Sequence, residues 1–126
     1  MPDLSRLLAP RSIAVVGGAP AERVVQQCRK LGFEGPIWPV HPTRPQLGGI
    51  DCVPSLADLP GVPDAVFLGV NRHATIESAR IANRLGAGGI VCYGSGFAET
   101  GDTDLQQELL DAAGDVPFFE IGRAHV

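Results

Sequence analysis

Short apolar runs alternate with amphipathic stretches along most of the chain. The runs are rich in β-branched residues and lie between glycine, proline or acidic residues, a pattern typical of buried parallel strands. Between several of these runs lie segments in which apolar residues recur at the spacing of one face of a helix. The predicted strands are residues 13–16, 37–40, 64–70, 89–93 and 116–119, and the predicted helices are about 20–31, 72–85 and 103–113.

Each predicted helix has boundary signals and an apolar stripe. Pro20 suits a first helical turn, Asn71 can cap the second helix, and Gly86 can end it. In the third helix Thr103 and Gln106 have the spacing of a capping box. The stripes are Val24, Val25, Cys28 and Leu31, then Ala74, Ser78, Ile81 and Leu85, then Leu105, Leu109 and Ala112.

Two segments complicate this alternation. Pro39 cannot donate a ladder hydrogen bond, so the strand at 37–40 is expected to be short or irregular. Residues 41–63 are rich in proline and glycine, and we expect a short strand near 50–53 and one helical turn near 55–59. The last strand is expected to pair in parallel with residues 90–93 and to bury Phe118 and Phe119.

Strands that alternate with helices indicate an α/β fold with a parallel sheet covered on both faces. The handedness of the crossovers favours a Rossmann-like doubly wound sheet, in a single domain over residues 1–120. In such sheets ligands bind beyond the carboxyl ends of the strands. Four loops are predicted to meet there, namely residues 17–20, 41–44, 71–73 and 94–97.

Two of these loops are rich in glycine. Gly17 and Gly18 precede Ala19 and Pro20 at a predicted helix start, where glycine lets a phosphate approach the backbone. The GxGxxG spacing is incomplete, because position 22 is Glu22, so these glycines either cradle a phosphate or simply form a turn. The fourth loop, with Gly94, Ser95 and Gly96, can hold a chain-like ligand or a phosphate.

The other two loops carry positive charge. An NAD-binding domain places an acidic residue at the end of its second strand, whereas this chain has His41, Pro42, Thr43 and Arg44 there. These donors suit a phosphate on the ribose, or else form a solvated loop with a capping role. Arg72 and His73 oppose the dipole at a helix start, which indicates a bound anion or an exposed pair of little effect.

Composition excludes several classes of function. The 126 residues carry 10 basic and 14 acidic side chains, and a net charge of −4 argues against bulk binding to nucleic acid. No apolar run is long enough to span a membrane, and the N-terminus lacks the apolar core of a signal peptide. Cys28, Cys52 and Cys92 have no disulfide or zinc spacing, so we expect reduced thiols and a cytoplasmic location.

The sequence shows no pattern that indicates catalysis or metal binding within the chain. Ser95 does not lie in a GxSxG nucleophile elbow, and His41, His73 and His125 lack the spacing of metal ligands. The sequence therefore predicts a binding domain without catalytic residues and without a metal site.

Three motifs together are specific: LLAPRSIAVVG at residues 7–17, GFEGPIWPVHP at 32–42 and SGFAE at 95–99. With them the chain resembles the N-terminal CoA-binding domain of NDP-forming acyl-CoA synthetases, which are relatives of the succinyl-CoA synthetase alpha subunit. The resemblance implies that Gly17, Gly18 and Ala19 approach coenzyme A. It also implies that the His41–Pro42 loop contacts its nucleotide end, and that the Asn71 and Ser95 loops flank the rest.

In full-length members of this family, ATP or another NTP, a carboxylic acid and coenzyme A react through an acyl phosphate and a phosphohistidine. The resemblance places that histidine in a following ligase domain or partner subunit, so the chain alone is expected to be inactive. Two local departures are a shorter first glycine loop and His41, where many members have asparagine. A stand-alone CoA-binding module and an NADP-binding oxidoreductase or redox-sensor domain remain alternative hypotheses.

The C-terminus departs from the family pattern. After Phe119 the family continues with a Gly-Pro-Asn-Cys motif, whereas this chain ends IGRAHV at residues 121–126. Those six residues are also what a common sequencing-adapter string encodes. We therefore expect that residues 121–126 are a non-native tail that makes no fixed contacts.

Overall fold

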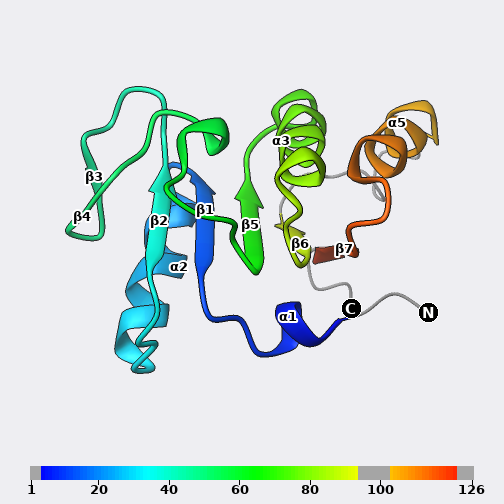
Figure 1. The fold of residues 1–126 in the computed structure, drawn as a ribbon. Coiled ribbons are helices and arrows are strands. Elements are labelled where there is room, and N and C mark those ends of the chain that lie inside the picture. Colours follow the sequence, from blue (N-terminus) through cyan, green and yellow to red (C-terminus); the bar gives the residue numbers. More distant parts are fainter. Residues whose placement is uncertain (1–3, 94–102, 122–126) are drawn as a thin grey trace, which may run out of the picture.

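A computed structural model describes residues 4–93 and 103–121 of the chain (Figure 1). Its centre is a parallel sheet with the strand order β2-β1-β5-β6-β7. The strands are β1 (Ile13–Gly17), β2 (Ile37–Val40), β5 (Ala65–Gly69), β6 (Ile90–Tyr93) and β7 (Phe118–Ile121). The predicted α/β, Rossmann-like doubly wound fold is confirmed. The strand order reverses direction between β1 and β5, which is where such sheets bind ligands.

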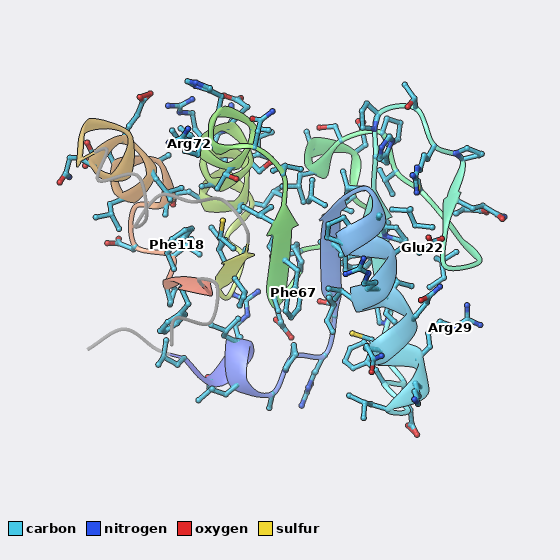
Figure 2. The ribbon with its side chains drawn as sticks, turned by 180° about the vertical axis from the view of Figure 1, so that it is seen from behind. Glu22, Arg29, Phe67, Arg72 and Phe118 are labelled. Carbon is cyan, nitrogen blue, oxygen red and sulfur yellow. The ribbon has the colours of Figure 1, made fainter. Side chains whose placement is uncertain are left out.

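Helices cover the sheet from both sides. On one face lie α3 (Arg72–Leu85) and α5 (Thr103–Ala113), and on the other lies α2 (Ala19–Lys30) (Figures 1 and 2). A short helix, α1 (Ser5–Leu8), precedes β1. Each face has its own apolar core, one around Leu68, Ile90 and Leu109 and the other around Val15 and Val25.

The predicted ends of α3 are confirmed. The side-chain oxygen of Asn71 accepts a hydrogen bond from the amide of Ala74 at 2.8 Å, and Gly86 follows the helix in the left-handed conformation. These two residues satisfy backbone groups that have no partner inside the helix. No helix in residues 4–93 and 103–121 has the length and apolar character needed to cross a membrane.

The apolar stripes of two helices were predicted in part wrongly. In α3 the buried residues are Thr75, Ile76, Ala79 and Ala82 rather than the predicted set. The buried face of α3 is rotated because the helix packs against α5 as well as against the sheet. In α2, Val25 is fully buried, but Leu31 follows the last turn and is 83% exposed.

A hairpin replaces the helix that would ordinarily connect β2 to the next parallel strand. It consists of β3 (Gln46–Leu47) and β4 (Ile50–Asp51), and the 3-10 turn η1 (Leu56–Asp58) follows it. The strand predicted near 50–53 is therefore β4 plus a single parallel bridge between Val53 and Val40. The helical turn predicted near 55–59 is confirmed.

The hairpin is fastened to α2. Arg29 Nη1 donates to the carbonyl of Gly48 at 2.6 Å, and the amide of Gly48 donates to Glu22 Oε2 at 3.3 Å. Glu22 and Arg29 both lie on the side of α2 that faces the hairpin (Figure 2). Leu47 is fully buried in the core beneath. These contacts fix where the segment returns to the carboxyl edge of the sheet.

The last strand confirms one prediction and corrects two. β7 pairs in parallel with β6, and Phe118 packs on the core under α3 and α5. Phe119 is 45% exposed, because alternate residues of a strand face opposite sides of the sheet. Ile121 pairs with Tyr93, so the strand continues one residue past the boundary predicted at residue 120. Strands pair through backbone N–H and C=O groups, so Ile121 can extend β7 even if it is not a native residue of the domain.

At the amino end of β5, Asp64 joins two parts of the N-terminal segment. Its carboxylate accepts from Arg6 Nε at 2.7 Å and from the amide of Arg11 at 2.8 Å. Arg6 also donates to the carbonyl of Gly86, at the end of α3. The hydrogen bond from the Arg11 amide, followed by that from Arg6, lowers the pKa of Asp64 below its ordinary value of 3.8.

We expect Asp64→Asn to lower the free energy of unfolding by roughly 1–2 kcal/mol at pH 7, because one or both hydrogen bonds to a charged acceptor are weakened. The pKa of Asp64 is lower in the folded chain than in the unfolded one. The stabilisation is therefore complete above about pH 4 and is lost as pH falls through the folded value. Urea denaturation at pH 7 and pH 2.5 measures the free energies of unfolding, and we expect the difference between the wild-type chain and Asp64→Asn to be smaller at pH 2.5.

The matched control is Glu77→Gln, which removes a salt bridge to Arg80 between exposed side chains of α3. Exposed pairs at this spacing contribute only ~0.5 kcal/mol or less. A deficit for Asp64→Asn that is no larger than that of the control, or that grows with acid, would contradict the assignment.

Candidate functional site

A cleft of about 440 Å³ opens at the carboxyl edge of the sheet, at the point where the strand order reverses. Its walls come from the ends of β1 and β2, from the segment that leads into η1, and from one side of α3. Most of the lining is apolar, with a few polar groups, and the volume lies in the range of small-molecule sites. The predicted location of the ligand site therefore coincides with a cleft.

The structure places four of the sequence-predicted site residues in the walls of this cleft: Gly17, Gly18, His41 and Pro42. Five others do not line it but lie within two positions of a lining residue in the sequence: Ala19, Pro20, Arg44, Asn71 and Arg72. The side chain of Asn71 caps α3. Arg72, also at the start of α3, is partly buried (Figure 2). The remaining three, Gly94, Ser95 and Gly96, lie outside the described residues.

The two adjacent glycines at the end of β1 have different environments. Gly17 has a φ of +139°, and a Cβ there would lie 2.6 Å from the carbonyl oxygen of Gly69 on β5. A Cβ on Gly18 would have no atom within 4 Å. Gly17 is thus required by packing between strands, whereas Gly18 leaves the backbone at the start of α2 open to the cleft.

His41 organises the loop after β2. Its Nδ1 accepts hydrogen bonds from the backbone amides of Thr43 at 3.1 Å and of Arg44 at 2.9 Å. Its own amide donates to the carbonyl of Val53 at 3.0 Å. The capping role that the sequence allowed for this loop is therefore present, and it belongs to a side chain that also lines the cleft.

Sequence reasoning missed two walls of the cleft. One is the segment that leads into η1, at Pro54, Ser55 and the first residue of η1, Leu56, which the bridge between Val53 and Val40 brings beside β2. The other is a face of α3, with Ala74, Glu77, Ser78 and Ile81. Three of these helical residues belong to the stripe that was predicted to be core. The signal available was the small size of Ala74 and Ser78, which leaves space beside the helix.

Two charged side chains near the cleft differ in whether they have a partner. With the described residues, the guanidinium of Arg44 makes no hydrogen bond and no salt bridge. Glu77, in the opposite wall, is paired with Arg80 at 2.9 Å. Arg44 lies two residues beyond Pro42, which lines the cleft, and an unpaired cation in this loop favours an anionic ligand.

The cysteines and acidic residues offer no reactive centre in the described part of the chain. Burial raises the pKa of the Cys28 thiol and, against the opposing charge of Arg44, that of the Cys52 thiol. Raised values keep thiols protonated and weakly nucleophilic. Among residues 4–93 and 103–121, no three His, Cys, Asp or Glu side chains gather as metal ligands would.

Comparison with known families identifies the chemistry of the expected ligand. The sequence profile of a family described as "CoA binding domain" matches residues 11–116. The match includes β1, β2, η1 and α3, which supply the walls of the cleft.

Individual relatives agree with this match. The chain is 33% identical over 116 residues to trans-feruloyl-CoA synthase FCS1 of an unknown prokaryotic organism, covering 88% of this chain and 16% of that protein. It is 32% identical over 113 residues to acetate–CoA ligase [ADP-forming] II of Archaeoglobus fulgidus, covering 86% of this chain and 17% of that protein. The chain thus spans about one sixth of the length of these relatives.

A solved structure gives the same result in three dimensions. The dinucleotide-forming acetyl-coenzyme A synthetase 1 of Ca. Korarchaeum cryptofilum, in complex with phosphate and ADP, superposes with a TM-score of 0.81 at 30% sequence identity. The alignment covers 90% of this chain and 25% of that one. The match in fold therefore extends over nearly the whole chain and over a small part of the larger enzyme.

Proposed function

The chain belongs to the CoA-binding domain family, and we propose that it binds the nucleotide end of coenzyme A in the cleft at the carboxyl edge of the sheet. The main observation that supports this binding site is the cleft. It lies at the switch point of the sheet and joins an apolar pocket to the open backbone of Gly18. Both features match what a nucleotide with a pyrophosphate needs.

Each part of the ligand has a counterpart in the cleft. The apolar surfaces of Pro54, Leu56 and Ile81 suit a base, and the start of α2 at Gly18 suits the pyrophosphate. The unpaired Arg44, in the loop that follows the cleft-lining Pro42, suits a phosphate on the ribose. Ala19, Pro20, Asn71 and Arg72 then border the bound molecule. Gly94, Ser95 and Gly96 stay predicted contacts for the rest of coenzyme A.

We also propose that the native protein is an NDP-forming acyl-CoA synthetase of which this chain is the CoA-binding part. The names of the relatives and the small share of their length that is matched support this proposal. ATP or another NTP would then act in the full-length enzyme, together with further ligase domains or a partner subunit. The chain alone would bind coenzyme A without forming a thioester.

Isothermal titration calorimetry with coenzyme A, NADPH and NAD tests the binding proposal. We expect coenzyme A to bind more tightly than NAD, because no acidic residue stands at the end of β2 to hold ribose hydroxyls. Binding of NAD or NADPH without binding of coenzyme A would overturn the proposal in favour of a nicotinamide-binding domain.

Ser78→Leu locates the ligand in the cleft. Ser78 lies in the α3 wall, and leucine is at least as favourable as serine in a helix, so the variant should fold normally. The added side chain occupies the cleft, and we expect affinity for coenzyme A to fall by roughly tenfold or more. The matched control is Gln27→Leu, which adds a similar group at an exposed position of α2 outside the cleft. Equal affinities in the two variants would place the ligand elsewhere.

A further inference from the structure

His41 uses its two ring nitrogens differently. Nδ1 accepts the amides of both Thr43 and Arg44, so it cannot carry a proton in this arrangement. A neutral imidazole with an acceptor nitrogen carries its proton on the other one. Nε2 is therefore an N–H donor, and it makes no hydrogen bond with the described residues.

The contacts of His41 connect three parts of the cleft. The ring lines the cleft, its backbone amide is held by Val53, and its Nδ1 holds the amide of Arg44. The two amides bound by Nδ1 would otherwise have only solvent as a partner in this exposed loop. The conformation of residues 41–44, and with it the place from which the Arg44 side chain starts, thus depends on one acceptor nitrogen.

We propose that His41 is a positioning residue that sets the preference of the cleft for a phosphorylated ribose. Through Nδ1 it holds the loop so that the Arg44 guanidinium meets the ribose phosphate, and through Nε2–H it donates to an oxygen of the same ligand. The proposal rests on the proposed function, since coenzyme A carries that phosphate and dephospho-coenzyme A lacks it.

The preference for one ligand over the other is the quantity to measure. We expect the chain to bind coenzyme A roughly tenfold or more tightly than dephospho-coenzyme A, as a charge-assisted contact to a phosphate would give. Arg44→Gln should remove most of this ratio. His41→Ala should remove it as well, although the alanine variant keeps the arginine.

The conservative variant His41→Asn separates positioning from general stability. The Asn side-chain oxygen stands where Nδ1 stands, one bond beyond Cγ, and Asn oxygens accept amides two or three residues further along the chain. We expect His41→Asn to restore most of the ratio, and His41→Phe, which fills the space but accepts nothing, to leave it lost. The double variant His41→Ala, Arg44→Gln should lose little more of the ratio than Arg44→Gln alone.

NMR of the labelled imidazole nitrogens gives a readout that needs no ligand. We expect His41 to be the Nε2–H tautomer in the free chain, and its Nε2–H signal to shift when coenzyme A is added. A proton on Nδ1, or an unchanged ratio in His41→Ala, would overturn the role of His41 while leaving coenzyme A binding intact. A wild-type chain that binds neither ligand would refute the proposed function and this inference with it.

Discussion

Gly17→Ala is expected to lower the free energy of unfolding by roughly 3 kcal/mol or more. Two costs combine. The φ of +139° is strained for any residue with a side chain, and the added Cβ would stand 2.6 Å from a carbonyl oxygen of the neighbouring strand. That oxygen belongs to Gly69, the last residue of the central strand β5, and Gly17 pairs with Gly69, so neither strand can move there without loss of pairing between β1 and β5. Urea or thermal denaturation measures the loss.

The neighbouring variant Gly18→Ala is the control. A Cβ on Gly18 contacts nothing, although its ψ of −116° lies outside the usual regions and adds some strain. We expect its cost in stability to be about 1 kcal/mol and clearly below that of Gly17→Ala. Equal stabilities of the two variants would show that the close approach of β1 and β5 does not constrain residue 17.

The sequence predicts the parallel sheet well because its signals are local. Each strand is a continuous apolar run that needs no knowledge of its neighbours. The ends of α3 are likewise decided by Asn71 and Gly86 alone. Packing that involves a third element is not local. The buried face of α3 depends on α5, and Leu31 is exposed because it lies just past the last residue of α2.

The residues of the candidate site likewise include some that local sequence signals predict and others that only tertiary contacts determine. Gly17, Gly18, His41 and Pro42 were predicted because each directly follows a strand, and strand ends define the binding edge of the sheet. The turn at 54–56 follows no strand of the main sheet. The bridge between Val53 and Val40 brings it beside β2, and the hairpin before it is fastened to α2 by two hydrogen bonds of Gly48, between positions 19 and 26 residues apart. No periodicity in the sequence encodes these contacts.

Deletion of residues 116–126 is expected to lower the melting temperature by roughly 10 °C or more. It removes the four paired positions between β7 and β6, the buried Val116 and the packing of Phe118, and it exposes an edge of β6. Without β7, the amide of Ile90 also loses its bond to the carbonyl of Pro117, at 2.8 Å. Differential scanning calorimetry of the shortened chain measures the effect.

Deletion of residues 122–126 provides the matched comparison, because the ladder between β7 and β6 ends at Ile121. We propose that these last five residues are not part of the fold and expect a melting temperature within about 2 °C of the full chain. Point variants then separate packing from strand pairing. Phe118→Ala should destabilise the chain more than Phe119→Ala, since Phe118 packs on the core whereas Phe119 is 45% exposed. If the five-residue deletion alone unfolded the chain, the C-terminal residues would belong to the domain and the boundary would lie beyond residue 126.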